Sequence, residues 1–565
     1  MTNMPRVFRR QPAKKPIQLS IVNDDTVRVK TYRLAQKDLS RIKNTCQVCD
    51  ARKTFDMPRE KLALLHSLDL PTETIPPHVW NVHRRPTSAM FDIALVPEKI
   101  RGTLFPYQLE GVRMIFDKYG GRSLLGDDMG LGKTRQGLAF AGHCLGLGAK
   151  RILLVCPSYL RYQWCHKFQE WLGIEPQLVK KGSEILTGQI CAVSYDMLCA
   201  LKIPTGVFDV VMCDESHYVK SRKAKRTKAM TPLVRSAKYA LLITGTPALN
   251  RPIELFSQLL MLRPTYIKNY TAYAKRYCNG KATPFGYDDR GSSKSWELHW
   301  ILKKGFMVRR LKRDVLTQLP KKLRHTVWLE VKADELKDVS SLFREWKYLN
   351  TKIYKLPQGS EQQRLMMFER KKIISELFRE TAAAKTAAVV RWVMSALSEG
   401  RSFIFFAYHR VTLDAVEEAV SQANISYMRI DGSTPAMKRN DNVEAFQNDD
   451  SMRIAILSIG AAGTGITLTR VSECVFGELY WVPGVMIQAE DRIHRLSQEH
   501  TCDIRYLLGT ETLDTYVHPS LCKKLATLDT LVDKRTDRTF EGTTTTTVPA
   551  EEESMLSMIS NMLDN

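Results

Sequence analysis

The sequence predicts an α/β fold built from two lobes, each a parallel β-sheet flanked by helices. Two observations favour this class. Short apolar runs typical of buried strands alternate with stretches of helical periodicity, over 101–262 and again over 385–515. A chain of 565 residues is also too long for one hydrophobic core, so several domains are expected.

In the first half, five short apolar runs are expected to be strands. They cover 122–125, 151–157, 190–195, 208–213 and 239–243. Ahead of them, 108–119 places Leu109, Val112 and Ile115 at spacings suited to one face of a helix. Parallel strands that are buried on both faces are nearly continuous in apolar residues, so helices should cover both sides of this sheet.

The second half repeats this pattern, with strands expected at 402–408, 427–430, 453–458, 473–481 and 503–508. Between the halves, 263–384 is rich in Lys, Arg, Glu, Leu and aromatic residues and poor in β-branched runs, which favours helices and a linker. A helical brace is expected over 516–540. The tail 541–565 is expected to be disordered, because EGTTTTTVPAEEES cannot bury a core.

The segment DDMGLGKT has the character of a phosphate-binding loop. Its glycines would bring backbone N–H groups to a phosphate at a helix N-terminus. Lys133 would reach the β- and γ-phosphates, and the Thr134 hydroxyl would bind Mg²⁺. Asp127 stands where the general pattern has its first glycine. The nucleotide-binding residues expected here are Asp127, Asp128, Met129, Gly130, Leu131, Gly132, Lys133 and Thr134.

An acidic pair follows one of the expected strands. Asp214 and Glu215 come directly after the apolar run at 208–213. Such a strand delivers side chains to the carboxyl edge of the sheet, where α/β folds bind ligands. Asp214 suits the coordination of Mg²⁺, and Glu215 suits the base that deprotonates the attacking water. The alternative is a solvated acidic pair, which the phosphate-binding loop upstream disfavours.

Further motifs occur in a defined order along the chain. They are LFPYQLEGVRMIF (104–116), LLVCPSYLRYQW (153–164), SYDML (194–198), LLITGTPALNRPIEL (241–255), SFIFFAYHR (402–410), RIDGST (429–434), ILSIGAAGTGITLT (456–469) and QAEDRIHRLSQ (488–498). From about Leu104 to Leu513 the series resembles the Swi/Snf-type branch of superfamily-two helicases, whose members are ATP-driven translocases on double-stranded DNA. The stretches 214–230 and 477–495 look most like the annealing-helicase branch, which remodels forks and rewinds duplexes.

The resemblance implies two RecA-like lobes with ATP between them. Gln108 would read the adenine edge. Arg492 and Arg495, on the second lobe, would stabilise charge that develops on the γ-phosphate, an effect on the order of 10³–10⁵ in rate in other NTPases. Because these arginines belong to the far lobe, hydrolysis would require the lobes to close. Closure would shift one lobe along the DNA.

The same resemblance places GAAGTG (460–465) between the arginine motif and the DNA strand, and its glycines Gly463 and Gly465 would bind the nucleotide. Thr244 and Thr246 would have the corresponding relay role on the first lobe. The alternative for Arg492 and Arg495 is a structural ion-pair network with the neighbouring carboxylates, which are Glu490 and Asp491.

Charge and cysteine usage agree with a DNA-binding protein. Lys and Arg number 84 against 60 Asp and Glu, a net charge of +24, which favours polyanionic partners such as phosphate backbones. Cys156, Cys191 and Cys213 fall within apolar strands, which indicates reduced thiols. With no apolar run of eighteen residues, we expect an intracellular protein with no membrane partner, nuclear in a eukaryote and cytoplasmic in a bacterium or phage.

Residues 1–100 are expected to be a basic accessory region. The first 60 residues carry fourteen Lys and Arg against six Asp and Glu. Cys46 and Cys49, followed by His78 and His83, have zinc-ligand types at plausible spacings within each pair. The gap between the pairs is longer than in the common zinc fingers. Unligated cysteines and surface histidines are therefore the alternative to a Zn²⁺ site.

Two further segments are candidates for binding partners. The basic residues of MVRRLKRDVLTQLPKK (307–322) would touch DNA phosphates or form a solvated linker. The apolar spacing of 555–563 suits a helix that docks a protein partner, or a frayed terminus. The sequence thus predicts an ATP-dependent double-stranded DNA translocase that remodels forks, junctions or DNA-bound proteins. The alternatives are the motor subunit of a restriction or defence complex and an ATP-gated DNA clamp without turnover.

Overall fold

The computed structural model describes residues 18–22, 26–30, 47–50, 54–58, 79, 90–264, 267, 269–283, 286–316, 318–357, 360–460 and 466–533. The chain divides into two compact units. The larger unit is Pro86–Ser293 with Phe306–Asn565, and the smaller is Met1–Arg85 with Lys294–Gly305. Both predicted lobes belong to the larger unit.

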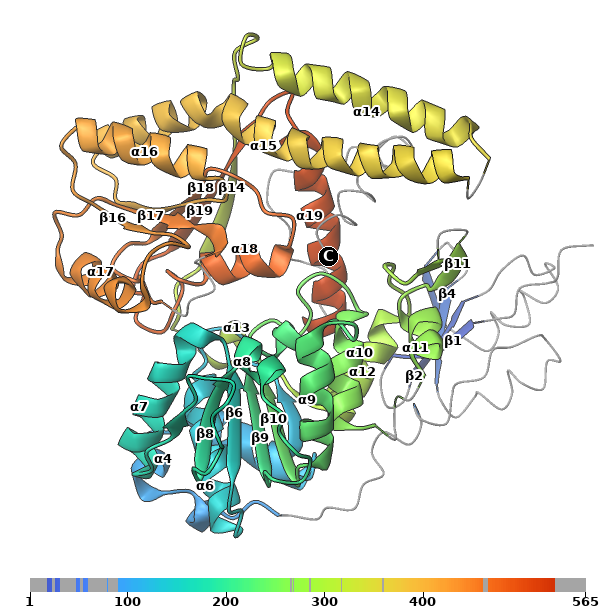
Figure 1. Ribbon diagram of the computed structural model, residues 1–565, viewed down its shortest axis with the longest axis vertical. Helices are drawn as coiled ribbons and strands as arrows, with labels where there is room; N and C mark the ends of the chain where they lie inside the picture. Colours follow the sequence, from blue (N-terminus) through green and yellow to red (C-terminus); the bar gives the residue numbers. More distant parts are fainter. Residues whose placement is uncertain are drawn as a thin grey trace, which may run out of the picture. The chain divides into compact units, whose positions relative to one another are not determined.

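The described part of the first lobe is built on a seven-stranded sheet in the order β13-β5-β10-β9-β6-β8-β7 (Figure 1). Its strands are β5 (Arg122–Leu125), β6 (Ile152–Cys156), β7 (Gln177–Leu178), β8 (Ile190–Ser194), β9 (Val210–Asp214), β10 (Tyr239–Ile243) and β13 (Met307–Val308). Every neighbouring pair is parallel. The five strands predicted from apolar runs are confirmed, and β7 and β13 are additional.

Helices cover both faces of this sheet. They are α5 (Pro106–Asp117), α6 (Lys133–Gly146), α7 (Arg161–Leu172), α8 (Tyr195–Ala200), α9 (Lys225–Ser236) and α10 (Glu254–Leu262). In this strand order, the chain runs in one direction along the sheet through α6 and α7 and returns through α8 and α9, so right-handed connections put α6 and α7 on one face and α8 and α9 on the other. Strands β5 and β9 both pair with β10 in parallel, so the loops that follow them lie at the same edge of the sheet, where the candidate site is found.

The second lobe has a described sheet of six parallel strands in the order β14-β19-β18-β15-β17-β16 (Figure 1). The strands are β14 (Lys322–Leu329), β15 (Phe403–Ala407), β16 (Tyr427–Ile430), β17 (Ile454–Ser458), β18 (Glu473–Phe476) and β19 (Cys502–Gly509). Its helices are α14 (Lys337–Lys355), α15 (Glu361–Ser398), α16 (Arg410–Gln422), α17 (Ala436–Asn448), α18 (Pro483–Glu490) and α19 (Asp514–Leu528).

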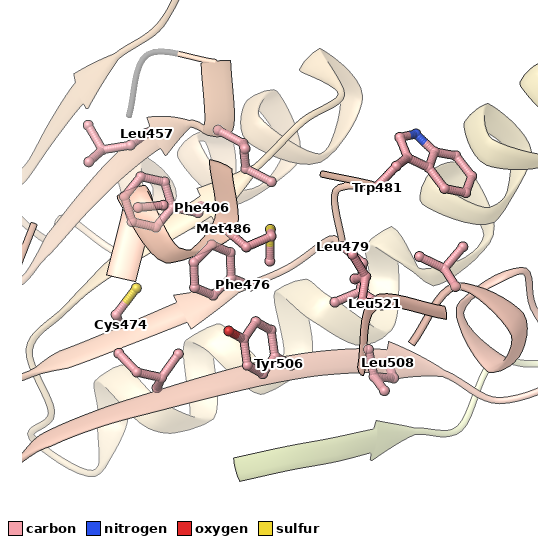
Figure 2. Packing of buried hydrophobic residues seen from close by; sticks show 14 of the residues in the cluster. Phe406, Leu457, Cys474, Phe476, Leu479, Trp481, Met486, Tyr506, Leu508 and Leu521 are labelled. Carbon is pink, nitrogen blue, oxygen red and sulfur yellow. The ribbon is translucent and has the colours of Figure 1, made fainter. Parts of the chain in front are cut away.

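Figure 2 shows how this lobe packs its core. Apolar side chains from β15, β17, β18 and β19 meet those of the loop before α18, of α18 and of α19. Those labelled are Phe406, Leu457, Cys474, Phe476, Leu479, Trp481, Met486, Tyr506, Leu508 and Leu521, each at most 3% exposed. Packing α18 into this core fixes the helix that leads directly into the arginine motif.

The structure differs from the expected boundaries at three places. Residues before 101 belong to the first lobe, since Val96 and Ile100 are each 1% exposed in its core. The interval 263–384 is not only helical, because it supplies β13 to the first sheet and β14 to the second, along with the hairpin β11 (Lys281–Thr283) and β12 (Gly286–Asp288). Helix α15 crosses the expected boundary at 385. Edge strands such as β13 and β14 are short or alternate with polar residues, so they lack the apolar runs that marked the central strands.

The smaller unit contains an antiparallel sheet in the order β1-β2-β4-β3, formed by β1 (Gln18–Ile21), β2 (Thr26–Lys30), β3 (Gln47–Asp50) and β4 (Thr54–Pro58). Helix α12 (Ser295–Gly305) packs against it. The Lys294 ammonium donates to the Leu19 carbonyl (2.7 Å), and the Arg28 guanidinium lies 5.7 Å from the centre of the Trp296 ring. A helix from the middle of the chain is thus part of the accessory region.

Several predictions from the sequence fall on residues outside the described ranges. Cys46, His78 and His83 are among them, and only the backbone of Cys49 is described, on β3. The tail 541–565 is also outside, whereas the described part of 516–540 is helical up to Asp533. Among the described helices, none has both the length and the apolar character needed to cross a lipid bilayer.

Candidate active site

A cavity of about 640 Å³ lies between the strand ends of the first lobe and the arginine motif of the second. Residues predicted from three separate motifs line it. They are Met129, Gly130, Gly132, Lys133, Thr134, Asp214, Glu215, Arg492 and Arg495. The fold therefore brings the phosphate-binding loop, the acidic pair and the arginines to one place.

The phosphate-binding loop has a backbone that only glycine adopts readily. Gly130 has φ +83° and Gly132 has φ +71°, and Gly132 caps the N-terminus of α6. A Cβ added to Gly132 would lie 2.2 Å from Gln108 Nε2. The glycines thus allow a close turn into the helix N-terminus, where N–H groups and the helix dipole favour an anion.

Lys133 begins α6 and extends its ammonium back along the loop. Its Nζ donates to the carbonyl oxygens of Asp127 (3.0 Å) and Asp128 (3.1 Å). Burial lowers the pKa of Lys133, and Glu215 opposes that shift. The Lys133 side chain therefore lies at the wall of the cavity, close to the acidic pair.

The acidic pair is held by specific contacts at the end of β9. Asp214 Oδ2 accepts a hydrogen bond from Trp164 Nε1 (2.7 Å), and Oδ1 accepts one from the Glu215 N–H (2.9 Å). Burial and the Glu215 charge raise the pKa of Asp214 to about 6. Glu215 has φ +50°, a left-handed backbone that is uncommon for a residue with a side chain.

Glu215 is the more acidic member of the pair. Burial alone would raise the pKa of its carboxyl group, but His217, Lys133 and Arg492 outweigh it and the net shift is downward. His217 Nδ1 lies 3.3 Å from Glu215 Oε2 and 3.3 Å from Thr244 Oγ1. Glu215 is thus ionised at neutral pH, as a base must be, and its Oε2, buried and without a hydrogen-bond partner among the described residues, lies beside the His217 ring.

Arg492 and Arg495 bind carbonyl and hydroxyl groups of their own lobe. Arg492 Nη1 donates to the Ile466 carbonyl (3.2 Å), and Arg495 donates to the Asp491 carbonyl (3.2 Å) and to Thr467 Oγ1. Burial lowers the pKa of both guanidinium groups, that of Arg495 to about 9 with a contribution from Arg492. Two buried cations beside each other are chemically suited to a polyanionic ligand.

The alternative ion-pair network is not the one observed. The carboxylate of Glu490 is bound by Lys322 (3.1 Å) and Arg324 (2.7 Å), and that of Asp491 by Lys322 (2.6 Å) and Lys312 (3.1 Å). These cations neutralise both carboxylates. Glu490 and Asp491 thus have partners other than Arg492 and Arg495, which lie on the cavity wall.

Asp127 and Asp128, expected to bind nucleotide, do not line the cavity. Asp127 is 0% exposed and accepts from the N–H and Nε of Arg310 (3.0 Å each) and from Gln136 Nε2 (2.9 Å). Asp128 Oδ1 lies 3.6 Å from Arg309 Nη2. Both carboxylates therefore anchor the segment after β13.

This arrangement corrects the interpretation of 307–322 as a source of phosphate contacts for three of its basic residues, whereas Arg313 and Lys321 are exposed and remain candidates. Arg309, Arg310 and Lys312 have side chains only 10%, 16% and 7% exposed, and each contacts the phosphate-binding loop or the arginine motif. The sequence signal was the density of positive charge. It did not indicate that the anions would be carboxylates of the same protein.

Gln108 and Leu131 lie behind the loop. Gln108 is 1% exposed, its Nε2 donates to the Leu131 carbonyl (3.1 Å) and its Oε1 accepts from the Phe105 N–H (3.1 Å). A second cavity of about 710 Å³ lies next to it, lined by Phe105, Tyr107, Leu316, Leu319 and Leu496 among others. This mostly apolar space was not foreseen from the sequence, because its walls come from distant segments.

Direct contacts join the lobes beside the site. Gln488 Nε2 donates to Thr246 Oγ1 (3.0 Å), and the Gly484 N–H donates to the Leu249 carbonyl (3.2 Å). Thr246 thus touches the other lobe, and Thr244 touches His217. Gly463 and Gly465 lie outside the described residues.

Comparison with known proteins identifies the same two lobes. Residues 107–385 match the model of the SNF2-related domain, and residues 384–497 match the helicase conserved C-terminal domain. The chain is similar to "DNA annealing helicase and endonuclease ZRANB3" of Bos taurus, with 37% identity over 461 residues, covering 78% of this chain and 42% of that protein.

Two further relatives are a "SWI/SNF-related matrix-associated actin-dependent regulator of chromatin subfamily A-like protein 1" and a homolog of that protein. The Xenopus tropicalis protein is 37% identical over 447 residues, covering 77% of this chain and 46% of its own length. The Caenorhabditis elegans homolog is 33% identical over 465 residues, covering 79% and 64%. This chain therefore matches less than two thirds of the length of each of these relatives.

Proposed function

Because this chain belongs to the SNF2-related family of helicase-like ATPases, we propose that it hydrolyses ATP in order to move along double-stranded DNA and remodel forks or junctions. One observation carries the proposal. Lys133, Asp214 and Glu215 of the first lobe and Arg492 and Arg495 of the second line the same cavity. The named activity of the annealing-helicase relative supports the remodelling role.

The residues of the site fit ATP with Mg²⁺. The N–H groups around Gly130 and Gly132, together with Lys133, would hold the phosphates at the start of α6. The Thr134 hydroxyl and the Asp214 carboxylate are oxygen donors of the type that Mg²⁺ prefers. The ion would neutralise charge on the β- and γ-phosphates. Trp164 and the Glu215 N–H orient the Asp214 carboxylate in advance.

Hydrolysis then depends on groups from both lobes. Glu215, ionised and beside His217, accepts a proton from the attacking water, a contribution of about 10²–10⁴ in rate. Arg492 and Arg495 stabilise the charge that grows on the transferred phosphoryl group. Because the two sets of residues are on different lobes, turnover is coupled to lobe closure, and closure is the step that moves DNA.

The adenine is proposed to enter the second cavity, beside Tyr107 and Gln108. Both N–H groups of the Gln108 amide already have protein acceptors, the Leu131 carbonyl (3.1 Å) and Tyr107 Oη (3.4 Å), so the group left for a base edge is a lone pair of its oxygen. The apolar walls would cover the faces of the base.

Other parts of the proposal rest on the sequence alone. They are a zinc ion held by Cys46, Cys49, His78 and His83, a contact of Gly463 and Gly465 near the nucleotide, and partner docking by 555–563. With a net charge of +24 and DNA as substrate, the protein would act in the nucleus of a eukaryotic cell or the cytoplasm of a bacterium.

The test is the rate of ATP hydrolysis with duplex, forked and single-stranded DNA and with RNA, at one salt concentration. We expect stimulation by duplex and forked DNA. Glu215→Gln should still bind ATP and DNA but turn over at least about a hundredfold slower. Lys133→Ala should weaken nucleotide binding itself. Glu170→Gln, on the exposed side of α7, is the matched control and should behave as wild type.

Two outcomes would contradict the proposal. If Glu215→Gln or Lys133→Ala keeps wild-type turnover, the site is elsewhere. If the wild-type protein binds ATP and duplex DNA tightly without DNA-stimulated turnover, the chain is an ATP-gated clamp and not a motor.

A further inference from the structure

The segment 309–312 connects the lobes and contacts both halves of the candidate site. On the first lobe, Arg309 Nη1 donates to the Gly126 carbonyl (2.7 Å), and Arg310 binds the buried Asp127 carboxylate. The Asp128 N–H in turn donates to the Arg310 carbonyl (2.9 Å). The start of the inter-lobe connection is therefore bound to the phosphate-binding loop by backbone and side-chain contacts.

Lys312, at the end of this segment, makes the contact with the second lobe. Its N–H donates to Asp128 Oδ2 (3.4 Å), whereas its ammonium donates to the His494 carbonyl (2.6 Å) and lies 3.1 Å from Asp491 Oδ1. A Cβ placed on Gly130 would be 3.5 Å from Lys312 Cε, so the lysine stem passes along the glycine turn.

The two residues that Lys312 binds on the second lobe, Asp491 and His494, each directly precede one of the arginines of the site. Asp491 immediately precedes Arg492, and His494 immediately precedes Arg495. The Asp491 carbonyl also accepts from Arg495 Nε (3.2 Å). A displacement of Asp491 or His494 relative to the phosphate-binding loop would therefore displace both guanidinium groups relative to a bound phosphate.

Neutralising Asp491 does not require Lys312. Lys322, which lies on β14 within the second lobe, binds the same Oδ1 atom at 2.6 Å. Burying a second ammonium against a carboxylate that already has a partner costs desolvation energy. Burial indeed lowers the pKa of Lys312, and Asp491 opposes that shift. The contact that Lys312 adds is a bridge from one lobe to the other.

We propose that Lys312 is a positioning residue that sets the distance between the phosphate-binding loop and the arginine motif in the closed site. The inference rests on the proposed ATPase. Lys312 acts on the transition state only through Arg492 and Arg495, so its loss slows turnover and leaves nucleotide affinity nearly unchanged. Displacements of about 1 Å in catalytic groups are enough to slow enzymes strongly.

The experiment compares Lys312→Met with Lys322→Met in the full chain. Each change removes one buried ammonium from Asp491, but only the first removes the bridge. We expect Lys312→Met to lower the DNA-stimulated kcat at least about tenfold, equivalent to about 1.4 kcal/mol, while the Kd for ATP analogue changes less than about threefold. Lys322→Met should keep kcat within about threefold, even if the second lobe melts at a lower temperature.

A double-variant cycle separates positioning from a general structural effect. In an Arg495→Ala background, Lys312→Met should slow turnover less than it does in the wild type, because part of the group it positions is gone. Lys312→Arg, which keeps the charge, should recover part of the lost kcat. If Lys312→Met does not fold, Lys312→Arg serves as the variant, with kcat expected to fall at constant ATP affinity.

Three results would overturn the inference. Equal loss of kcat in Lys312→Met and Lys322→Met would mean that only the charge of Asp491 matters. A loss of affinity that matches the loss of kcat would mean a role in binding, and full additivity with Arg495→Ala would mean independent effects. Wild-type protein without DNA-stimulated turnover would overturn the proposed function itself, a failure that is visible before any variant is made.

Discussion

Replacing Asp127 by asparagine should destabilise the first lobe and leave the nucleotide contacts in place. Asp127 occupies a position of the phosphate-binding loop where glycine is usual, so the sequence alone suggests a role at the phosphates. In the structure its carboxylate is 0% exposed and outside the cavity lining. It accepts hydrogen bonds from Arg310 and from Gln136.

The magnitude follows from these contacts. Asparagine keeps the shape of the side chain but loses the charge that pairs with Arg310, and its NH₂ group faces donors of Arg310 or Gln136. Removing one partner of a buried ion pair costs about 3–5 kcal/mol. In a lobe of this size, one kcal/mol corresponds to about 2–4 °C, so the lobe should melt roughly 6–20 °C lower.

The assay is thermal unfolding with hydrogen exchange followed in β5 and α6, combined with ATP-analogue binding well below the transition. Asp196→Asn, an exposed acid on α8 of the same lobe, is the matched control and should shift melting little. The double change of Asp127→Asn with Arg310→Met should cost less than the sum of the two single changes. If Asp127→Asn melts like wild type but loses ATP-analogue affinity, Asp127 is a nucleotide ligand and the structural reasoning is wrong.

Three other predictions concern pH, the glycine turn and zinc. Burial and two neighbouring lysines lower the pKa of His494 to about 4, so the folded protein holds it neutral and stability is lost as the pH falls from 6.5 towards 4. The free energy of unfolding should fall by about 2 kcal/mol between pH 7 and pH 5 for this reason. In His494→Gln, the free energy of unfolding measured by denaturation should depend less on pH, and equal pH profiles for variant and wild type would contradict the prediction. Gly132→Ala should weaken ATP-analogue binding about tenfold or more, because the added Cβ would collide with Gln108. Gly148→Ala is the control, since Gly148 has φ +86° and open space around it, so that the change should strain only the backbone. Equal affinities of the two variants for the ATP analogue would refute the steric argument. Purified protein should carry about one equivalent of zinc that Cys46→Ser releases, and metal analysis without zinc under reducing, chelator-free conditions would remove that site.

The central strands and the three motifs that line the candidate site could be predicted from the sequence because their signals are local. A strand buried on both faces, such as β6 or β9, must be apolar at nearly every position. Phosphate binding requires small residues at the start of a helix, so the spacing of Gly130 and Gly132 can be recognised in the sequence. The acidic pair and the arginines follow the same logic, since each motif carries its chemistry within a few residues.

The partners of charged residues could not be predicted, because only tertiary structure decides them. Arg310 and Asp127 are 183 positions apart, and Lys312 and His494 are 182 apart. The same run of basic residues in a sequence is compatible with binding DNA phosphates and with pairing to buried carboxylates. The structure places Arg309, Arg310 and Lys312 on carboxylates and carbonyls of the protein, and it places β13, β14 and α12 in sheets or units that their local sequence does not indicate. Local sequence determines which chemical groups a segment carries. The packing of distant segments determines which of its charged groups can bind a ligand, because a cation buried beside a carboxylate of the same protein is already paired and is not accessible to a phosphate.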